Sequence, residues 1–322
     1  MRRMRVDIAV VGAGPAGATA ARLLACLGRQ VVLIDPGQSK RDRLEIVSPT
    51  ATGIVQALQL EEVLADPSIA RPCAGIRRTW SSKEQEIDDF LFQPGSQGFI
   101  IDRAGFDAQL HGLALAAGAT AVDGRAVDVC RNQNGFEIKI RSADMTTNLL
   151  ASLLVDATGR SAALACRLGG GRMVKERLVA ERTLLDKSGE PSQEMAWLDV
   201  EAREGSWTYA TLGPDGRRES WSVCRDKRRR MARGERLNAS AACLKHAAGK
   251  DWIAVGDAAA SFDPIASQGL VNALSSALVA VGAIAAEGGI VPDAAADYSA
   301  AMMATFAYSE LGRAEVYCAL SN

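Results

Sequence analysis

The sequence is poor in histidine, in net charge and in long apolar runs. It has two histidines among 322 residues, His111 and His246, so a histidine-rich metal site is excluded and a histidine-based triad has two candidates. Its 37 basic and 38 acidic residues leave a net charge of −1, which gives no reason to expect a nucleic acid or a membrane surface as partner. Demanding chemistry would therefore need a bound cofactor, and we predict no metal site.

Cysteine usage and hydropathy exclude further classes. The seven cysteines are odd in number, widely spaced and without a C-x-x-C pair, which argues against a disulfide framework and against a zinc cluster. We therefore expect reduced thiols and a cytoplasmic protein. The most apolar later stretch, residues 277–286, is far shorter than the about 20 residues that a membrane helix needs.

The N-terminal residues 6–35 have the order strand, glycine-rich turn, helix, strand and acid. In the turn, Gly12 permits the tight bend, Gly14 lets the backbone approach a pyrophosphate, and Gly17 lets helix and strand pack closely. The free N–H groups at the helix start would face the phosphates. Asp35 would accept hydrogen bonds from the ribose hydroxyls. This context predicts a dinucleotide site and leaves FAD and NAD both open.

A second strand, turn and helix follow near the C-terminus. Residues 252–255 are an apolar strand that ends in Gly256-Asp257, and Asp263-Pro264 precedes a predicted helix over 269–286. A carboxylate at the carboxyl end of a strand lies where open α/β sheets bind ligands. The next helix start offers N–H groups to an anion.

These motifs resemble the FAD-dependent aromatic hydroxylases with the p-hydroxybenzoate hydroxylase fold. The matching segments are 43–45 (an arginine-containing loop), 102–110 (an R-x-x-F-D-x-x-L helix), 156–161 (an A-T-G segment) and 256–269. The resemblance covers about residues 10–165 and 245–285. It implies FAD and an α/β fold, in which a three-layer Rossmann-type FAD-binding domain with a parallel sheet carries an inserted mixed or antiparallel β-sheet substrate domain.

The turns and the resemblance together assign the cofactor contacts. They are Gly12, Gly14, Ala16, Gly17, Asp35, Arg43, Arg103, Gly159, Gly256, Asp257, Pro264, Gly269, Leu270 and Asn272. In the family, the aspartate of the second motif binds the ribityl chain and the proline loop runs alongside the isoalloxazine. The helix start after that loop faces flavin O2 and N1.

A discontinuous domain plan follows from the same resemblance. We expect FAD-binding pieces at 1–76, 101–168 and 242–290, a substrate domain from 77–100 and 169–241, and a helical segment at 291–322 that packs over the flavin domain.

Three segments are similar to one branch of that family. Residues 78–103, 205–214 and 263–269 resemble the branch of tryptophan halogenases and of the flavoproteins that mature tryptophan-derived quinone cofactors. The resemblance implies a monooxygenase that hydroxylates an electron-rich, indole-like ring through a flavin C4a-hydroperoxide. O2 is the oxidant, and NAD(P)H or a separate flavin reductase supplies electrons. The substrate is a small aromatic or a tryptophan-bearing peptide or protein.

The residues that would line the aromatic pocket are Trp80, Trp207, Tyr209 and Pro264, and no catalytic acid or base is assigned. A halogenase and an FAD-dependent dehydrogenase or reductase stay open as alternatives, as does a flavoprotein that escorts a partner. Two observations count against halogenation. The W-x-W-x-I-P signature is broken, because Tyr209 replaces its second tryptophan and its Ile-Pro is absent. Lys83 lies near the place of the amine that relays the halogenating species in halogenases, but it lacks the expected neighbours.

One segment departs from the even charge distribution. Residues 225–236 contain seven basic and two acidic side chains. A solvated face is the simple interpretation, and docking of an acidic partner at Arg225–Arg236 is the sharper one.

Overall fold

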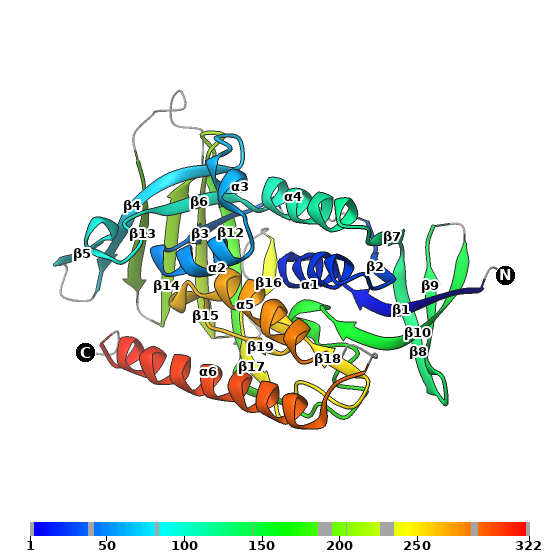
Figure 1. The fold of residues 1–322 in the computed structure, drawn as a ribbon. Helices are drawn as coiled ribbons and strands as arrows, with labels where there is room; N and C mark the ends of the chain where they lie inside the picture. The colour runs from blue at the N-terminus through cyan, green and yellow to red at the C-terminus, as the bar shows by residue number, and fades with distance from the viewer. Residues whose placement is uncertain are drawn as a thin grey trace.

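The computed structural model describes residues 3–37, 42–80, 84–143, 145–185, 195–203, 205–225, 235–284 and 289–319. Two large sheets lie side by side within these residues, with helices packed around them (Figure 1). One sheet is mainly parallel and the other is mixed, so the predicted α/β class with a second sheet is confirmed. No helix in the described residues is both long and apolar enough to cross a membrane.

The first sheet carries the predicted dinucleotide unit. Its strand order is β7-β2-β1-β10-β9-β8, and β18 also pairs with β10. The strands are β1 (Arg3–Val11), β2 (Val31–Asp35), β7 (Thr120–Asp123), β8 (Arg125–Asn132), β9 (Gly135–Arg141), β10 (Thr146–Asp156) and β18 (Trp252–Ala254). β1, β2, β7, β10 and β18 run parallel, so their carboxyl ends meet at one edge.

Helices cover this sheet, and small residues let them pack closely. They are α1 (Pro15–Cys26), α4 (Arg103–Ala116), α5 (Gly269–Gly282) and α6 (Pro292–Ala319). α1 contacts both α4 and α5, and its buried face consists largely of alanine. The predicted helix over 269–286 is shorter than expected, because α5 ends at Gly282. α6 contacts α5, the loop at 264–266, and the short strands β17 and β19.

The second sheet has the order β16-β12-β15-β14-β13-β4-β6-β3, with β5 beside β4. Its strands are β3 (Leu44–Val47), β4 (Ala70–Thr79), β5 (Gln85–Asp89), β6 (Gly98–Asp102), β12 (Leu178–Leu185), β13 (Ala196–Arg203), β14 (Ser206–Leu212), β15 (Arg218–Arg225) and β16 (Arg236–Asn238). All pairs are antiparallel except β13 with β4. Every second residue of β15 is buried, which places Trp221 on the inner face.

Short elements connect the two sheets. A third, three-stranded sheet consists of β11 (Arg172–Glu176), β17 (Ala241–Leu244) and β19 (Ala260–Ser261). The short helices are η1 (Pro49–Ala51), α2 (Thr52–Ala57), α3 (Glu61–Ala65), η2 (Phe90–Phe92), η3 (Gly159–Ser161), η4 (Gly256–Ala258) and η5 (Pro264–Ala266). Because β3 and most of β4 fall within 1–76 and yet lie in the second sheet, the chain crosses between sheets repeatedly. The domain boundaries stay a prediction.

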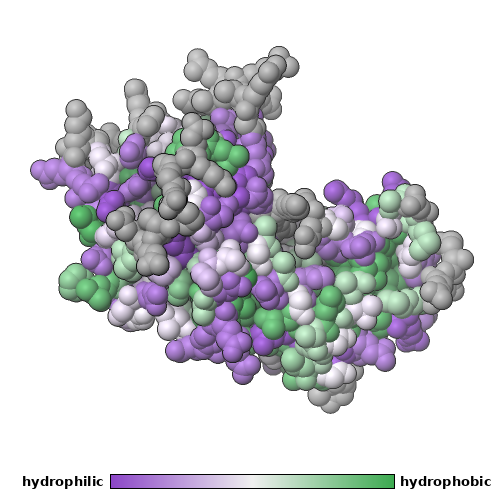
Figure 2. Space-filling view, turned by 90° about the horizontal axis from the view of Figure 1, so that it is seen from above, coloured by the Kyte–Doolittle hydropathy of each residue, from purple (hydrophilic) through white to green (hydrophobic). Residues whose placement is uncertain are grey.

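One end of the second sheet exposes apolar side chains. Ile87 in β5 is 59% exposed, and Leu91 and Phe92 in η2 are 67% and 85% exposed. Figure 2 shows hydrophobic surface at the left edge of the molecule, the end where Figure 1 places β5. Exposed apolar groups that lie together are typical of contact surfaces.

Candidate active site

A cavity of about 840 Å³ lies between the two sheets. Its lining comes from nearly the whole chain, from Gly14 just before α1 to Val316 in α6. The first sheet contributes turns at the carboxyl ends of its strands, and the second sheet contributes its inner face. The four predicted pocket residues, Trp80, Trp207, Tyr209 and Pro264, all line this cavity.

The glycine-rich turn is held by contacts that admit no side chain. Gly12 has φ +106°, and a Cβ there would lie 2.2 Å from the carbonyl oxygen of Ala157. A Cβ on Gly17 would lie 1.9 Å from the carbonyl oxygen of Gly12. The backbone N–H of Ala13 donates to Asp35 Oδ2 at 2.9 Å. Gly12 and Asp35 therefore support the turn from behind the cavity lining.

A buried carboxylate shapes the turn that follows β10. Asp156 is 1% exposed, and its oxygens accept the backbone N–H groups of Thr158, Leu164 and Ala165 at 2.7–3.0 Å. This network fixes the A-T-G segment, where Gly159 lines the cavity with φ +65°. The charge of Asp156 is thus used to hold the backbone rather than to meet a ligand.

The second cofactor motif approaches the first at close range. A Cβ on Gly256, which has φ +59°, would lie 2.7 Å from the Cβ of Ala16 at the start of α1. Asp257 lines the cavity and pairs with Arg160 at 3.3 Å. Arg160 also donates to the carbonyl oxygen of Phe262 at 2.9 Å, so it ties three turns together.

The predicted cofactor residues divide into two groups. Ten line the cavity: Gly14, Ala16, Gly17, Arg43, Arg103, Gly159, Asp257, Pro264, Gly269 and Leu270. The other four, Gly12, Asp35, Gly256 and Asn272, lie just outside the lining. The Nδ2 atom of Asn272 is buried without a hydrogen-bond partner among the described residues. The close glycine turns, the helix start of α1 and this unpaired donor fit a bound dinucleotide such as FAD.

An ion-paired carboxylate faces the cavity between these turns and the second sheet. Arg103 is 3% exposed and pairs with Glu45 and with Asp107, the latter at 3.0 Å, while Arg43 lies 3.7 Å from Glu45. Burial by itself would raise the pKa of Glu45, but the charges of Arg103 and Arg43 outweigh it and lower that pKa below its ordinary value. Glu45 is therefore an anion inside the cavity that sequence reasoning had not singled out.

Three aromatic side chains form the opposite wall. The rings of Trp207 and Tyr209 have centroids 5.6 Å apart, and those of Tyr209 and Trp221 are stacked at 6.4 Å. The indole N–H of Trp207 donates to Tyr317 Oη, and that of Trp221 donates to Glu219 Oε1, each at 3.0 Å. Both indole N–H groups are therefore already bonded within the protein.

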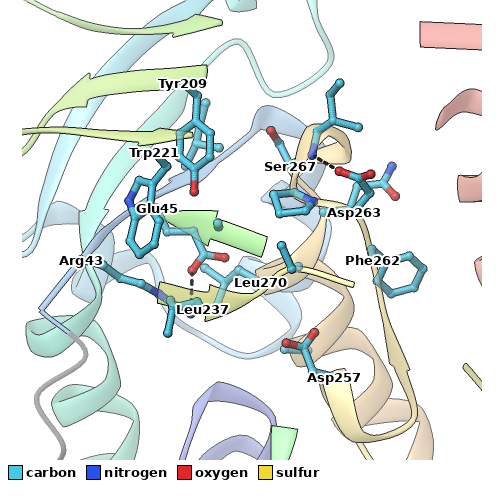
Figure 3. Close-up of a pocket in the computed structure, with 18 of the residues that line it drawn as sticks. Arg43, Glu45, Tyr209, Trp221, Leu237, Asp257, Phe262, Asp263, Ser267 and Leu270 are labelled. Carbon is cyan, nitrogen blue, oxygen red and sulfur yellow. Dashed lines mark hydrogen bonds and ion pairs between the residues drawn. The ribbon is translucent and has the colours of Figure 1, made fainter. Parts of the chain in front are cut away.

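The hydroxyl of Tyr209 is the polar atom that this wall presents to the cavity. It points into the open space between Trp221 and the loop that contains Asp263 and Ser267 (Figure 3). Among the described residues it has no hydrogen-bond partner, and burial raises the pKa of Tyr209 above its ordinary value. The phenol stays protonated near neutral pH and can donate a hydrogen bond to a ligand.

The remaining candidates lie at the rim or outside. Trp80 donates through Nε1 to Glu86 at 2.9 Å, and Glu86 is exposed. Neither His111 nor His246 lines the cavity, and no group of metal-ligating side chains occurs in the described residues. Lys83 and residues 226–234 of the basic segment lie outside the described residues. The ends of that segment, Arg225 and Arg236, pair with Glu176 and Glu181.

Two protein families match adjoining parts of the chain, and the first match includes the glycine-rich turn. Residues 5–56 match the FAD binding domain family, and residues 54–210 match the tryptophan halogenase family. A putative FAD-dependent oxidoreductase, LodB, of Marinomonas mediterranea is 26% identical over 84% of this chain and 82% of the relative. A menaquinone reductase of Mycolicibacterium smegmatis is 26% identical over 92% of this chain and 79% of the relative.

Solved structures agree on the fold. The peptidyl tryptophan dihydroxylase QhpG, essential for tryptophylquinone cofactor biogenesis, is 26% identical with a TM-score of 0.69, over 86% of this chain and 66% of that protein. The flavin-dependent brominase Bmp2 is 18% identical with a TM-score of 0.72, over 94% and 83%. A halogenase from Xanthomonas campestris is 16% identical with a TM-score of 0.79, over 94% and 75%. The last two similarities show the fold alone.

The predicted resemblance is confirmed by these matches, including its branch. An FAD-binding domain and a flavin-dependent enzyme are confirmed with it.

Proposed function

Because this chain is a flavin-dependent enzyme similar to tryptophan halogenases and to a peptidyl tryptophan dihydroxylase, we propose that it hydroxylates an electron-rich aromatic ring. The observation that carries this proposal is the wall of Trp207, Tyr209 and Trp221, which faces the Pro264 loop across one cavity. Offset stacking on such a wall would orient a flat ring and stabilise its binding by about 0.5–1.5 kcal/mol beyond the contribution of its buried area. An indole, as in tryptophan, is the substrate class that this geometry favours.

The turns of the first sheet would hold FAD, which when bound supplies electron transfer and oxygen activation. The N–H groups at the start of α1 would bind its phosphates, and Asp257 its ribityl chain. The start of α5 would stabilise negative charge on the ring by about 0.3–2 kcal/mol. The part of these residues is to bind and orient the cofactor.

The second sheet would orient the substrate and exclude water. Leu198, Val200 and Leu237 line the cavity beside the aromatic wall and keep that side apolar. The Tyr209 hydroxyl would donate a hydrogen bond to a polar atom of the substrate. The protein's part in the reaction is thus to position the ring and to keep the site dry.

A partner polypeptide is the carrier that we favour for the aromatic ring. Strand β5 contributes Glu86 to the cavity and exposes Ile87, and η2 next to it exposes Phe92. An apolar surface beside a cavity rim suits a substrate that is part of a chain.

We further propose that the basic segment Arg225–Arg236 docks an acidic partner. We also propose that NAD(P)H or a separate reductase supplies electrons, and that the protein works in the cytoplasm.

Halogenation and reduction are the second candidates. The family match over residues 54–210 favours a halogenase, and the identity to menaquinone reductases favours a reductase. Tyr209 in place of the second signature tryptophan counts against the first.

Mass spectrometry under ¹⁸O2 tests the proposal. The purified protein is supplied with FAD, NAD(P)H or a flavin reductase, and either free indoles or tryptophan-bearing peptides. We expect product that contains ¹⁸O and forms regardless of chloride or bromide. Product whose mass depends on the halide would instead identify a halogenase. Product formed under strict exclusion of oxygen would identify a dehydrogenase or reductase, and either result overturns the hydroxylase.

A further inference from the structure

A chain of hydrogen bonds joins the end of α6 to both walls of the cavity. Trp207 Nε1 donates to Tyr317 Oη at 3.0 Å, and Tyr317 Oη donates to Asp263 Oδ2 at 3.0 Å. Arg313 Nε donates to the same carboxylate oxygen at 2.9 Å. We call Trp207, Asp263, Arg313 and Tyr317 the clasp, because their hydrogen bonds join three elements: β14, the loop before η5, and α6.

Asp263 acts directly on a loop that lines the cavity. Its carboxylate is almost wholly buried, and Oδ1 accepts the backbone N–H of Ile265 at 3.1 Å, which caps η5. Pro264 and Ile265, the first residues of η5, line the cavity. Any shift of the carboxylate would therefore move the loop at the bound flavin.

The last turns of α6 are held by polar contacts. Phe306 is the last residue of α6 that is a buried hydrophobic among the described residues. Beyond it, Arg313 bridges Asp263, Glu176 of β11 and Glu310, and its guanidinium carbon lies 4.6 Å from the centre of the Tyr317 ring. The Tyr317 ring also packs against the apolar cluster of the second sheet, and Val316 lines the cavity, so polar and apolar contacts hold this end of the helix together.

We propose that Arg313 and Tyr317 are positioning residues that close the cavity and set the Pro264 loop. By holding α6 against Asp263 and Trp207, they exclude water and fix the distance between the aromatic wall and the loop. The proposal rests on the proposed function in so far as the cavity is the flavin and substrate site.

Two substitutions test the clasp. Tyr317→Phe removes the hydroxyl that bonds to Trp207 and Asp263 while keeping the ring, and Arg313→Gln removes the guanidinium that also donates to Asp263 Oδ2. Tyr308→Phe is the matched control, since Tyr308 is on the same helix and 76% exposed. Circular dichroism verifies that each variant is folded before it is compared.

The first readout is amide hydrogen exchange of the flavin-free protein. We expect about threefold to tenfold faster exchange at residues 263–269 and in the last turns of α6 in Tyr317→Phe and Arg313→Gln, from the loss of one or two hydrogen bonds. The control should match wild type. Unchanged exchange in both folded variants, or equal acceleration across the whole chain, would overturn the clasp.

The second readout is iodide quenching of the fluorescence of bound FAD. We expect the quenching constant to rise severalfold in the two clasp variants and to stay constant in Tyr308→Phe. A protein that binds no FAD would defeat the proposed function, while the exchange experiment would still decide the clasp. A quenching constant that equals wild type in both variants would show that the cavity is not closed by these residues.

Discussion

The two sheets that enclose the cavity specify their site residues in different ways. On the first sheet, backbone approaches backbone so closely that Gly17 has room for no other residue. On the second sheet, side chains from separate strands meet face to face, as Tyr209 of β14 does with Trp221 of β15. The first kind of site leaves a short motif in the sequence, and the second leaves only the alternation of a half-buried strand.

The difference separates two tasks. A nucleotide has the same phosphates in every enzyme, so a rigid turn with few allowed residues serves it. A substrate pocket is built from interchangeable side chains on strands that keep their backbone pairing whatever side chain they carry. Substitutions in the first region should therefore remove the cofactor, whereas those in the second should alter the choice of substrate.

The sharpest test of the first region is Gly17→Ala. Its Cβ would lie 1.9 Å from the carbonyl oxygen of Gly12, which is backbone and cannot swing aside. We expect flavin binding to be lost and the free energy of unfolding to fall by at least about 3 kcal/mol, the upper end of the range for an overpacked core. Gly112→Ala in α4 is the matched control, because no atom lies within 4 Å of its Cβ. That change should stabilise the helix by about 0.5–1 kcal/mol. If the Gly17→Ala protein still binds flavin and is yellow, the contrast between the two regions is contradicted.

A smaller effect is expected at the boundary of the two regions, from Arg103→Met. Removing Arg103 leaves Glu45 facing the cavity with Arg43 as its remaining ion-pair partner, and the free energy of unfolding should fall by about 3 kcal/mol. In the wild type the lowered pKa of Glu45 stabilises the fold above the ordinary carboxyl pKa, and this stability is lost as the pH falls.

In Arg103→Met, burial is no longer offset by that charge, so the contribution of Glu45 should instead be lost as the pH rises. Urea unfolding between about pH 4 and pH 7 measures whether the free energy of unfolding rises or falls with pH, which is the slope that the two proteins should show with opposite signs. The double variant with Glu45→Gln is the control and should show neither slope. The same slope in wild type and Arg103→Met would contradict the assigned ion pair.

The mildest effect is expected in the second region, from Tyr209→Phe. The ring and its stacking stay, and the hydroxyl that faces the cavity is lost. We expect flavin binding to be unchanged and kcat/KM for the aromatic substrate to fall about threefold to tenfold, the worth of one hydrogen bond. Lost flavin, or unchanged kinetics with every indole tested, would remove Tyr209 from the substrate site.

The sequence was most informative where the chemistry of the backbone limits residue choice. Gly12 and Asp257 lie just after the carboxyl ends of parallel strands, as the motif spacing indicated, and their contacts with a cofactor stay a prediction. The α/β class was implied by the family resemblance that these motifs carry. The end of α5 at Gly282 was not predictable, since the small residues continue beyond it.

The rest of the site depends on long-range pairing that a single sequence does not contain. Trp207 and Tyr317 are 110 positions apart, and Tyr317 and Asp263 are 54 apart, so nothing local joined them. Glu45 was visible as part of the arginine loop, but its role depends on Arg103, 58 positions later. The alternation of β15 buries Trp221, but alternation alone does not indicate which face of the strand looks into a cavity.

The pairing of β10 has a consequence for how the protein is made. The central parallel strands come from residues 3–11, 146–156 and 252–254, so the ribosome delivers the glycine turn long before its neighbours. Contacts of such separation form late, and a nascent chain that has only β1, α1 and β2 presents an open strand edge to its surroundings. Because Asp257 after β18 and Gly269 of α5 line the cavity, a nascent chain cannot form the whole cavity until those residues have left the ribosome.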